Sequence, residues 1–251
     1  MEQLHGNRPE VNLTDESVTG DPKDIFHTDP VRITYYTDPL CCWSWALDHE
    51  MQQLHAEFKG KFSMRYCMGG LISSWKNFSD EKNSVYRPSQ LGPVWLHMTR
   101  VTGVPADSRI WVNDPPSTSY LSCIAVKCAG LQSPGSAERY LNRLRIAVML
   151  HGRNISRKEI LFDIARQMES ESSGIWFDSD RFIQDFERGR GVEAFRKDMD
   201  ELKIRSIHEF PTLILSNGEG RDILIAGYRK YPVIRSAFTE IFKSGARSGK
   251  F

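Results

Sequence analysis

The strongest constraint on the fold is a change of hydrophobic period close to the start of the chain. Residues 31–37 (VRITYYT) have the β-branched and aromatic composition of a strand and end at Asp38-Pro39, a turn signal. Apolar residues then recur at helical spacing over 43–58, and 61–68 (KFSMRYCM) has the pattern of a second strand. A strand, a helix and a strand with short links predict a right-handed βαβ unit with a parallel pair of strands.

The period of two returns near the end of the chain. Residues 211–215 (PTLIL) predict a strand, Asn217-Gly218 is a hairpin signal, and 222–226 (DILIA) predict the returning strand. Pro232 then opens a closing helix. Because the stretch between the two halves is mostly helical, the sequence predicts an α/β fold, βαβ then ββα, with a helical insertion.

The chain therefore divides into a core, an insertion and two polar ends. The N-terminal segment carries seven acidic residues against Arg8 and Lys23 and has few large apolar groups, so it cannot offset its ordering entropy by burial. The expected segments are a flexible arm at 1–29, the α/β core at 30–77 and 205–243, the helical insertion at 78–204 and a flexible tail at 244–251.

The charge balance and the cysteine count narrow the class of protein. Lys and Arg number 33 against 32 Asp and Glu, which gives no overall attraction to nucleic acid or to anionic lipid. No apolar run approaches the roughly 20 residues that span a bilayer, and the N-terminus lacks the pattern of an export signal. Five cysteines, an odd number, argue against a disulfide scaffold and for a reducing compartment. We expect a cytoplasmic globular protein that binds neither nucleic acid nor membrane.

The sharpest candidate for chemistry is Cys41, which follows the first predicted strand and opens the first helix. Free backbone N–H groups and the positive end of the helix dipole stabilise a thiolate at such a position, and the thiolate is the attacking species in disulfide chemistry. The alternative is that the adjacent pair Cys41-Cys42 only fills space near the start of the helix.

A second feature is predicted to lie beside this cysteine. If the third strand is antiparallel to the first, it begins at the sheet edge where the first ends, so Pro211 should lie next to Cys41. A proline at this junction is a candidate for a cis peptide bond that turns backbone groups toward an incoming extended chain. The alternative is an ordinary trans proline at the start of an edge strand.

These motifs resemble those of a known family. The run Asp38-Pro39-Leu40-Cys41-Cys42-Trp43-Ser44, the helical insertion and Phe210-Pro211-Thr212 together resemble the DsbA family of thioredoxin-like proteins. The likeness is greatest to the cytoplasmic members whose active site has the pattern D-P-x-C-x-W-C, and it spans about residues 31 to 243. The resemblance implies a thioredoxin-like fold, with Phe210 and Pro211 in contact with substrate. Trp43 is a further candidate for substrate contact, but it lies on the apolar face of the predicted helix at 43–58, which favours core packing as the alternative. The family includes oxidoreductases, isomerases, transferases and adaptors for proteolysis.

One position departs from the family pattern. Members that exchange disulfides carry a second cysteine where this chain has Ser44. By the resemblance, Cys41 is the nucleophile and Ser44 a hydroxyl donor to its thiolate. Turnover then needs an external thiol such as glutathione, or another cysteine. The candidates for that resolving role are Cys67, at the same edge of the predicted sheet, and Cys42, whose bond to Cys41 would close a strained ring; for Cys67 a buried apolar cysteine remains the alternative.

Three functions follow. The first is a monothiol thiol–disulfide oxidoreductase acting on protein or small-molecule disulfides, with no resident cofactor and with glutathione as a possible co-substrate. The second is a non-catalytic adaptor that binds a protein partner on the same fold. The third is a glutathione-dependent transferase or isomerase, which usually has serine where Cys41 stands. His49 and His55 lack the spacing of metal ligands, so no metal is expected. The sequence gives neither the substrate nor the oligomeric state.

Overall fold

The computed structural model describes residues 31–172, 174, 176–218 and 220–248. Its single sheet has the strand order β2-β1-β3-β4. The central strand β1 is parallel to β2 and antiparallel to β3, and β3 pairs with β4 as an antiparallel hairpin. The strands are β1 (Val31–Thr37), β2 (Phe62–Met68), β3 (Thr212–Ser216) and β4 (Asp222–Ala226). The predicted α/β fold, with βαβ and ββα halves in one sheet, is therefore confirmed.

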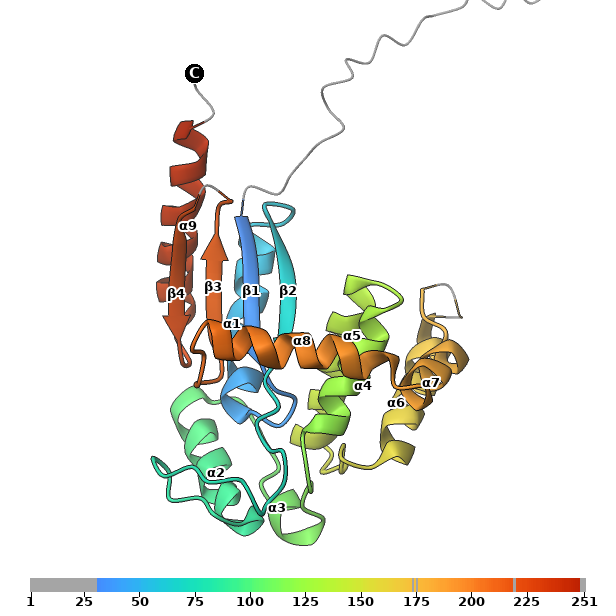
Figure 1. The fold of residues 1–251 in the computed structure, drawn as a ribbon. Helices are drawn as coiled ribbons and strands as arrows, with labels where there is room; N and C mark the ends of the chain where they lie inside the picture. Colours follow the sequence, from blue (N-terminus) through green and yellow to red (C-terminus); the bar gives the residue numbers. More distant parts are fainter. Residues whose placement is uncertain (1–30, 173, 175, 219, 249–251) are drawn as a thin grey trace, which may run out of the picture.

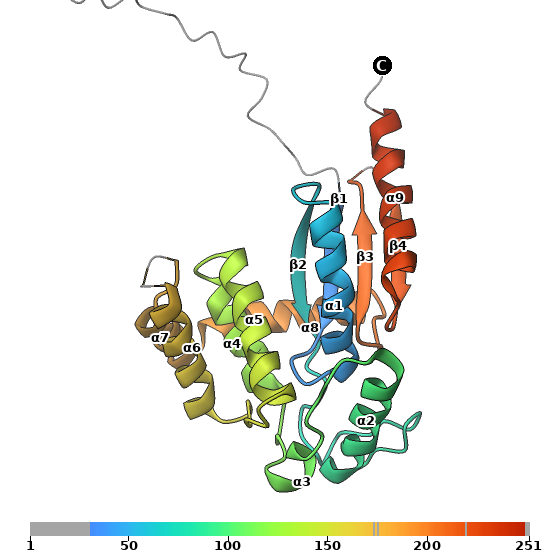
Figure 2. The same ribbon diagram turned by 180° about the vertical axis from the view of Figure 1, so that it is seen from behind.

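Two helices cover one face of the sheet, as Figure 2 shows: α1 (Cys42–Glu57) and α9 (Tyr231–Ser248). Leu47, Met51 and Leu54 lie on the buried side of α1 at the helical spacing seen in the sequence. They pack with the inward residues of β1 and β3 and with Phe238 of α9 in one apolar cluster, which we call the sheet cluster.

The opposite face is crossed by a single helix, α8 (Arg190–Ile204), which lies over the ends of the strands nearest to the insertion (Figure 1). Leu202 of α8 packs there against Tyr36 of β1 and Cys67 of β2. A side-chain hydrogen bond from Tyr36 to Glu201, 2.7 Å long, also joins this helix to the sheet. Helix α8 thus lies within the predicted insertion by sequence but covers part of the core.

The insertion forms a second and larger apolar cluster, which we call the insertion cluster. Trp95 and Trp111 meet at its centre with ring planes at 88°. Its helices are α2 (Leu91–Thr102), preceded by the 3₁₀ turn η2 (Pro88–Gln90), α3 (Ile110–Asn113), α4 (Tyr120–Gly130), α5 (Pro134–Met149), α6 (Lys158–Ser172) and α7 (Ser179–Glu187). Leu40, Cys42 and Trp45 also belong to this cluster, so the start of α1 packs against the insertion.

The structure differs from the sequence-based expectations in two places. Helix α7 was not predicted; it is short, and its start is fixed by the Asp178 side chain, which accepts a hydrogen bond from the backbone N–H of Arg181 at 2.8 Å. The last helix continues to Ser248, so the part of the expected tail at 244–248 is helical. The expected arm at 1–29 and residues 249–251 lie outside the described residues.

Candidate functional site

The sulfur of Cys41 lies at the N-terminus of α1, as predicted. Cys41 is the N-cap residue, and its Sγ accepts a hydrogen bond from the backbone N–H of Ser44 at 3.4 Å. This contact satisfies one of the N–H groups that a helix leaves free at its start. The residue is only 6% exposed, so the sulfur is close to the surface but largely covered.

The proline predicted to lie beside this cysteine does so. The Phe210-Pro211 peptide bond is cis. The Cys41 thiol donates to the carbonyl oxygen of Phe210, with 3.5 Å between Sγ and O. The Phe210 ring is held against Gly69, because a Cβ at that glycine would lie 2.4 Å from the ring. Three segments from different parts of the sequence therefore meet at Cys41.

Burial works against ionisation of this thiol. The pKa of Cys41 is raised, chiefly because burial removes water from the charged form, and the Asp38 carboxylate adds to the rise. The hydroxyl and the backbone N–H of Ser44 lower the pKa, as does the Arg145 guanidinium. The Ser44 hydroxyl makes no hydrogen bond of ordinary length to the described residues and is fully buried, so its effect on the sulfur acts at longer range. The helix terminus alone does not produce the low pKa that the sequence suggests.

Asp38 joins the loop before Cys41 to the insertion. Its carboxylate is fully buried and accepts hydrogen bonds from the backbone N–H of Leu71 at 2.7 Å and from the Ser119 hydroxyl at 2.8 Å. The Cys123 thiol donates to the same carboxylate at 3.4 Å. Burial raises the pKa of Asp38, although these donors oppose the rise. The sequence marks Asp38 only as a turn residue, and nothing in its pattern points to Ser119 or Cys123 as partners.

Trp43 is half-buried and packs against the insertion cluster. It is partly exposed and contacts the rings of His97 on α2, at 5.9 Å between centroids, and of Tyr228, at 6.0 Å. The buried tryptophan of this turn is Trp45, whose indole N–H donates to the carbonyl of Pro105 at 3.0 Å. Trp43, His97 and Tyr228 form what we call the aromatic surface. Tyr228 follows Gly227, whose backbone N–H donates to the carbonyl of Pro211 at 2.8 Å.

Neither candidate for a resolving thiol is well placed. All five cysteines are free and buried. Cys67 is fully buried under α8, its thiol donates to the carbonyl of Asp198 at 3.6 Å, and burial raises its pKa. Cys42 points into the insertion cluster, and burial raises its pKa well above the usual value. Cys128 packs on α4 against Gly191 of α8, with its pKa raised by burial to about 12.

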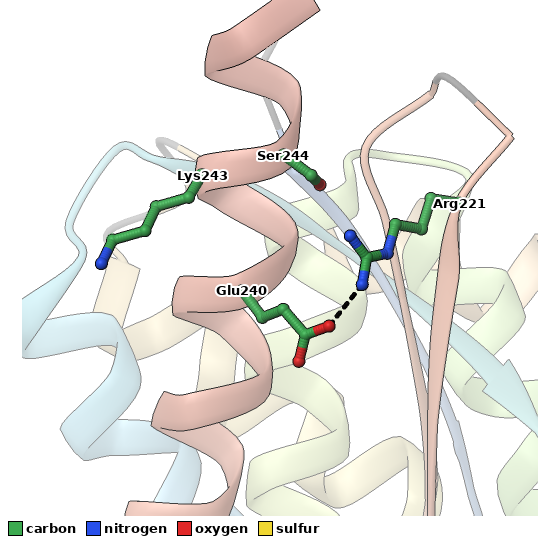
Figure 3. A pocket seen from close by; sticks show the side chains of 4 residues that line it. All are labelled: Arg221, Glu240, Lys243 and Ser244. Atoms are coloured by element: carbon green, nitrogen blue, oxygen red, sulfur yellow. Dashed lines mark hydrogen bonds and ion pairs between the residues drawn. The ribbon is translucent and has the colours of Figure 1, made fainter.

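Among the described residues, no group of three or more His, Cys, Asp or Glu side chains is arranged to hold a metal ion. A hollow of about 340 Å³ is lined by Arg221, Glu240, Lys243 and Ser244, with an ion pair between Arg221 and Glu240 (Figure 3). It lies beside the β3–β4 hairpin, at the opposite end of the sheet from Cys41, and does not belong to this site.

The fold and the site together identify the family. A family model described as thioredoxin matches residues 35–236, which is most of the chain. The chain belongs to this thioredoxin family. Within the described residues, no helix is long and apolar enough to span a bilayer.

Two curated relatives that match at low identity have the same protein name. The chain is 28% identical over 206 residues to the ClpXP adapter protein SpxH of Halalkalibacterium halodurans, a match covering 81% of this chain and 65% of that protein. It is 22% identical over 216 residues to the ClpXP adapter protein SpxH of Bacillus subtilis, covering 84% and 68%. The chain thus matches about two thirds of the length of these relatives.

Solved structures with this fold include redox proteins. A putative protein disulfide isomerase from Nitrosomonas europaea is similar with a TM-score of 0.68 and 16% identity, over 87% of this chain and 98% of that one. The cytosolic disulfide reductase DsbM from Pseudomonas aeruginosa gives 0.60 and 17%, over 86% and 97%. At these identities the likeness establishes the fold alone.

Proposed function

We propose that this chain is an adaptor that binds a protein partner and presents it to the ClpXP protease. The relatives named as ClpXP adapter proteins support this proposal at 22–28% identity. A cytoplasmic location is part of it. The adaptor is one of the three functions that the sequence suggests, and these relatives favour it over monothiol redox catalysis.

The observation that carries the proposal is the covered sulfur of Cys41 opposite Ser44. A disulfide exchange enzyme needs an accessible thiolate and a second thiol that releases the mixed disulfide. Here Cys41 is 6% exposed, the pKa of its thiol is raised by burial, and the fourth residue of the motif is a buried serine. A binding protein needs neither an accessible thiolate nor a second thiol, and it keeps the surface around the motif.

The test is a reconstituted degradation assay. Proteins retained equally by the tagged wild-type chain and by Cys41→Ala are purified, and each is incubated with ClpXP in the presence and absence of the chain. We expect the chain to accelerate degradation of its partner severalfold, and Cys41→Ala to act as well as the wild type. If no retained protein is degraded faster, the adaptor function is wrong.

The aromatic surface is the expected contact for the partner. Trp43, His97 and Tyr228 come from α1, from α2 and from the loop after β4, and this loop is bonded to Pro211 through the backbone N–H of Gly227. Large aromatic side chains often dominate the energy of protein interfaces. Trp43→Ala should weaken retention of the partner by at least about tenfold, in line with an interface hot spot. Trp176→Ala, at a partly exposed tryptophan of the insertion, is the matched control and should leave retention unchanged.

Monothiol exchange at Cys41 is the second candidate function. It is favoured by the position of the sulfur at a helix N-terminus, 3.5 Å from the carbonyl before the cis proline. The Cys41 thiolate would attack a disulfide, form a mixed disulfide and release one thiolate. Glutathione thiolate, as co-substrate, would then attack the sulfur of the bound group, forming a new disulfide and freeing the Cys41 thiolate.

This candidate has its own test. Incubation with oxidised glutathione should give an adduct at Cys41 that mass spectrometry locates, and Cys41→Ser should abolish it. Ser44→Cys, which replaces a buried hydroxyl by a thiol of similar shape, should allow an internal disulfide to Cys41. Absence of the adduct in the wild-type chain over long incubation would remove the exchange function while leaving the adaptor function open.

A further inference from the structure

A buried arginine of the insertion contacts both α1 and the end of β1. Arg145 belongs to α5 and is 1% exposed. One terminal nitrogen, Nη1, donates to the carboxylate of Asp48 on α1, and the other, Nη2, donates to the hydroxyl of Thr37 at the end of β1. The third nitrogen, Nε, is buried and has no hydrogen-bond partner among the described residues.

These contacts join the Arg145 guanidinium to β1, the strand that leads into Cys41. Thr37 ends the strand that leads into the cysteine loop, and Arg145 donates to its side chain. The guanidinium also lies 5.8 Å from the centre of the Tyr35 ring, and the Tyr35 hydroxyl donates to the backbone carbonyl of Ser44 at 2.9 Å. Because water is excluded here, a charge acts over a longer range than it would at the surface.

We propose that Arg145, supplied by the insertion, is a positioning residue that favours ionisation of the Cys41 thiol. It acts without touching a substrate, through its charge and through its hold on the end of β1. This role is independent of the adaptor function, because it concerns only the protonation of one thiol. It extends to the exchange function, since any mixed disulfide must form from the thiolate.

The charges around the sulfur support this assignment. The titratable groups that face it are Asp38 in its own loop, Cys42 on α1, Tyr35 on β1 and Arg145 on α5; Asp48 and His49 lie further along α1. Burial and Asp38 raise the pKa of Cys41, and Arg145 is the one cation among the groups that lower it. Asp48 balances the guanidinium, and its own pKa is raised by burial despite that neighbour.

The test is the pH dependence of alkylation at Cys41. Iodoacetamide labelling is followed by mass spectrometry in a Cys42→Ala background, so that the peptide holds one thiol. Arg145→Met should raise the Cys41 pKa, which slows labelling severalfold at a fixed pH below the pKa. Arg145→Lys, which keeps the charge, should recover most of the rate.

Asp48→Asn separates charge from structure. It breaks the same ion pair but leaves the cation, so the Cys41 pKa should stay the same or fall. If Arg145→Met does not fold, Arg145→Met with Asp48→Asn removes both charges from the buried pair and supplies the measurement. A rise of the pKa in that double variant supports the proposal. An unchanged Cys41 pKa in Arg145→Met and in the double variant overturns the proposal. An equal rise of the Cys41 pKa in Asp48→Asn and in Arg145→Met also overturns it.

Discussion

The two halves of α1 pack in different apolar clusters. Its later turns, with Leu47 and Leu54, pack in the sheet cluster, whereas its first turn, with Cys42 and Trp45, packs in the insertion cluster. The loop before Cys41 also contacts the insertion through hydrogen bonds, which Asp38 accepts from Ser119 and Cys123. The thioredoxin-like core therefore supplies the cysteine, but the insertion supplies much of its environment.

The largest expected effect comes from removing the central aromatic residue of each cluster. Trp95→Ala and Phe238→Ala each delete a side chain that is 1% exposed or less. Each should lower the free energy of unfolding by about 3–5 kcal/mol, measured by urea titration. Only Trp95→Ala should also speed hydrogen exchange in the first turn of α1.

The control for both substitutions is Val112→Ala, at a residue that is 71% exposed, with an expected change below about 0.5 kcal/mol. Equal effects of Trp95→Ala and Phe238→Ala on hydrogen exchange near Cys41 would contradict the division of α1 between the clusters.

A substitution that creates a steric clash tests how closely α8 packs against α4. A Cβ at Gly191 would lie 2.6 Å from both the Cys128 sulfur and the Ile124 carbonyl oxygen. Gly191→Ala should therefore cost about 2–3 kcal/mol of unfolding free energy, although alanine favours helix. Gly135→Ala is the matched control, since its nearest atom would be 3.5 Å away, and it should be neutral or stabilising. Equal stability of the two variants would show that α8 can move away from α4.

The polar link at Asp38 should have a smaller effect. Ser119→Ala removes one donor to the buried carboxylate and should cost about 1–2 kcal/mol near neutral pH. The folded-state pKa of Asp38 is raised, so its stabilising contribution is complete below the unfolded pKa and is lost as the pH rises through the folded pKa.

Loss of the Ser119 donor raises this pKa further, because that hydrogen bond lowers it in the wild type. The deficit of Ser119→Ala should therefore shrink in acid, where the carboxyl is protonated in both proteins. Denaturant titrations at acidic and at neutral pH measure this change, and a deficit independent of pH would contradict the role of the carboxylate.

The smallest effect is expected where α8 crosses the sheet. Burial of Glu201 opposes its ionisation, but hydrogen bonds from Arg65 and Tyr36 lower its pKa overall. Its stabilising contribution is therefore present above the unfolded pKa and is lost as the pH falls through the folded one. Glu201→Gln should cost less than about 1 kcal/mol at neutral pH, since the pair is partly exposed. Asp200→Asn, at an exposed ion pair with Lys203, is the control.

The sequence predicted the fold well because its signals are local. The strands at 31–37 and 222–226 match the observed bounds, and the turn signals between the elements lie where the chain turns. The meeting of Cys41 and Pro211 followed from strand direction alone and is confirmed. Position on a strand or helix, read from the hydrophobic period, was therefore enough to bring the two together.

The environment of the cysteine could not be predicted in the same way. A helix N-terminus suggests a low thiol pKa, but burial of Cys41 raises it. Arg145 lies on an amphipathic helix that carries other charged residues, and nothing in the sequence marks this one as buried. Its partners Thr37 and Asp48 are about a hundred residues away in the chain, and no spacing links them.

The contact between Gly69 and Phe210 has a consequence for protein engineering. The aromatic ring occupies the space that any side chain at residue 69 would need. The loop that carries Pro211 is thus shaped by a residue at the end of β2, in the other half of the fold. A designer who transplants this loop onto a different scaffold must carry the glycine with it, or the acceptor facing the sulfur will be displaced.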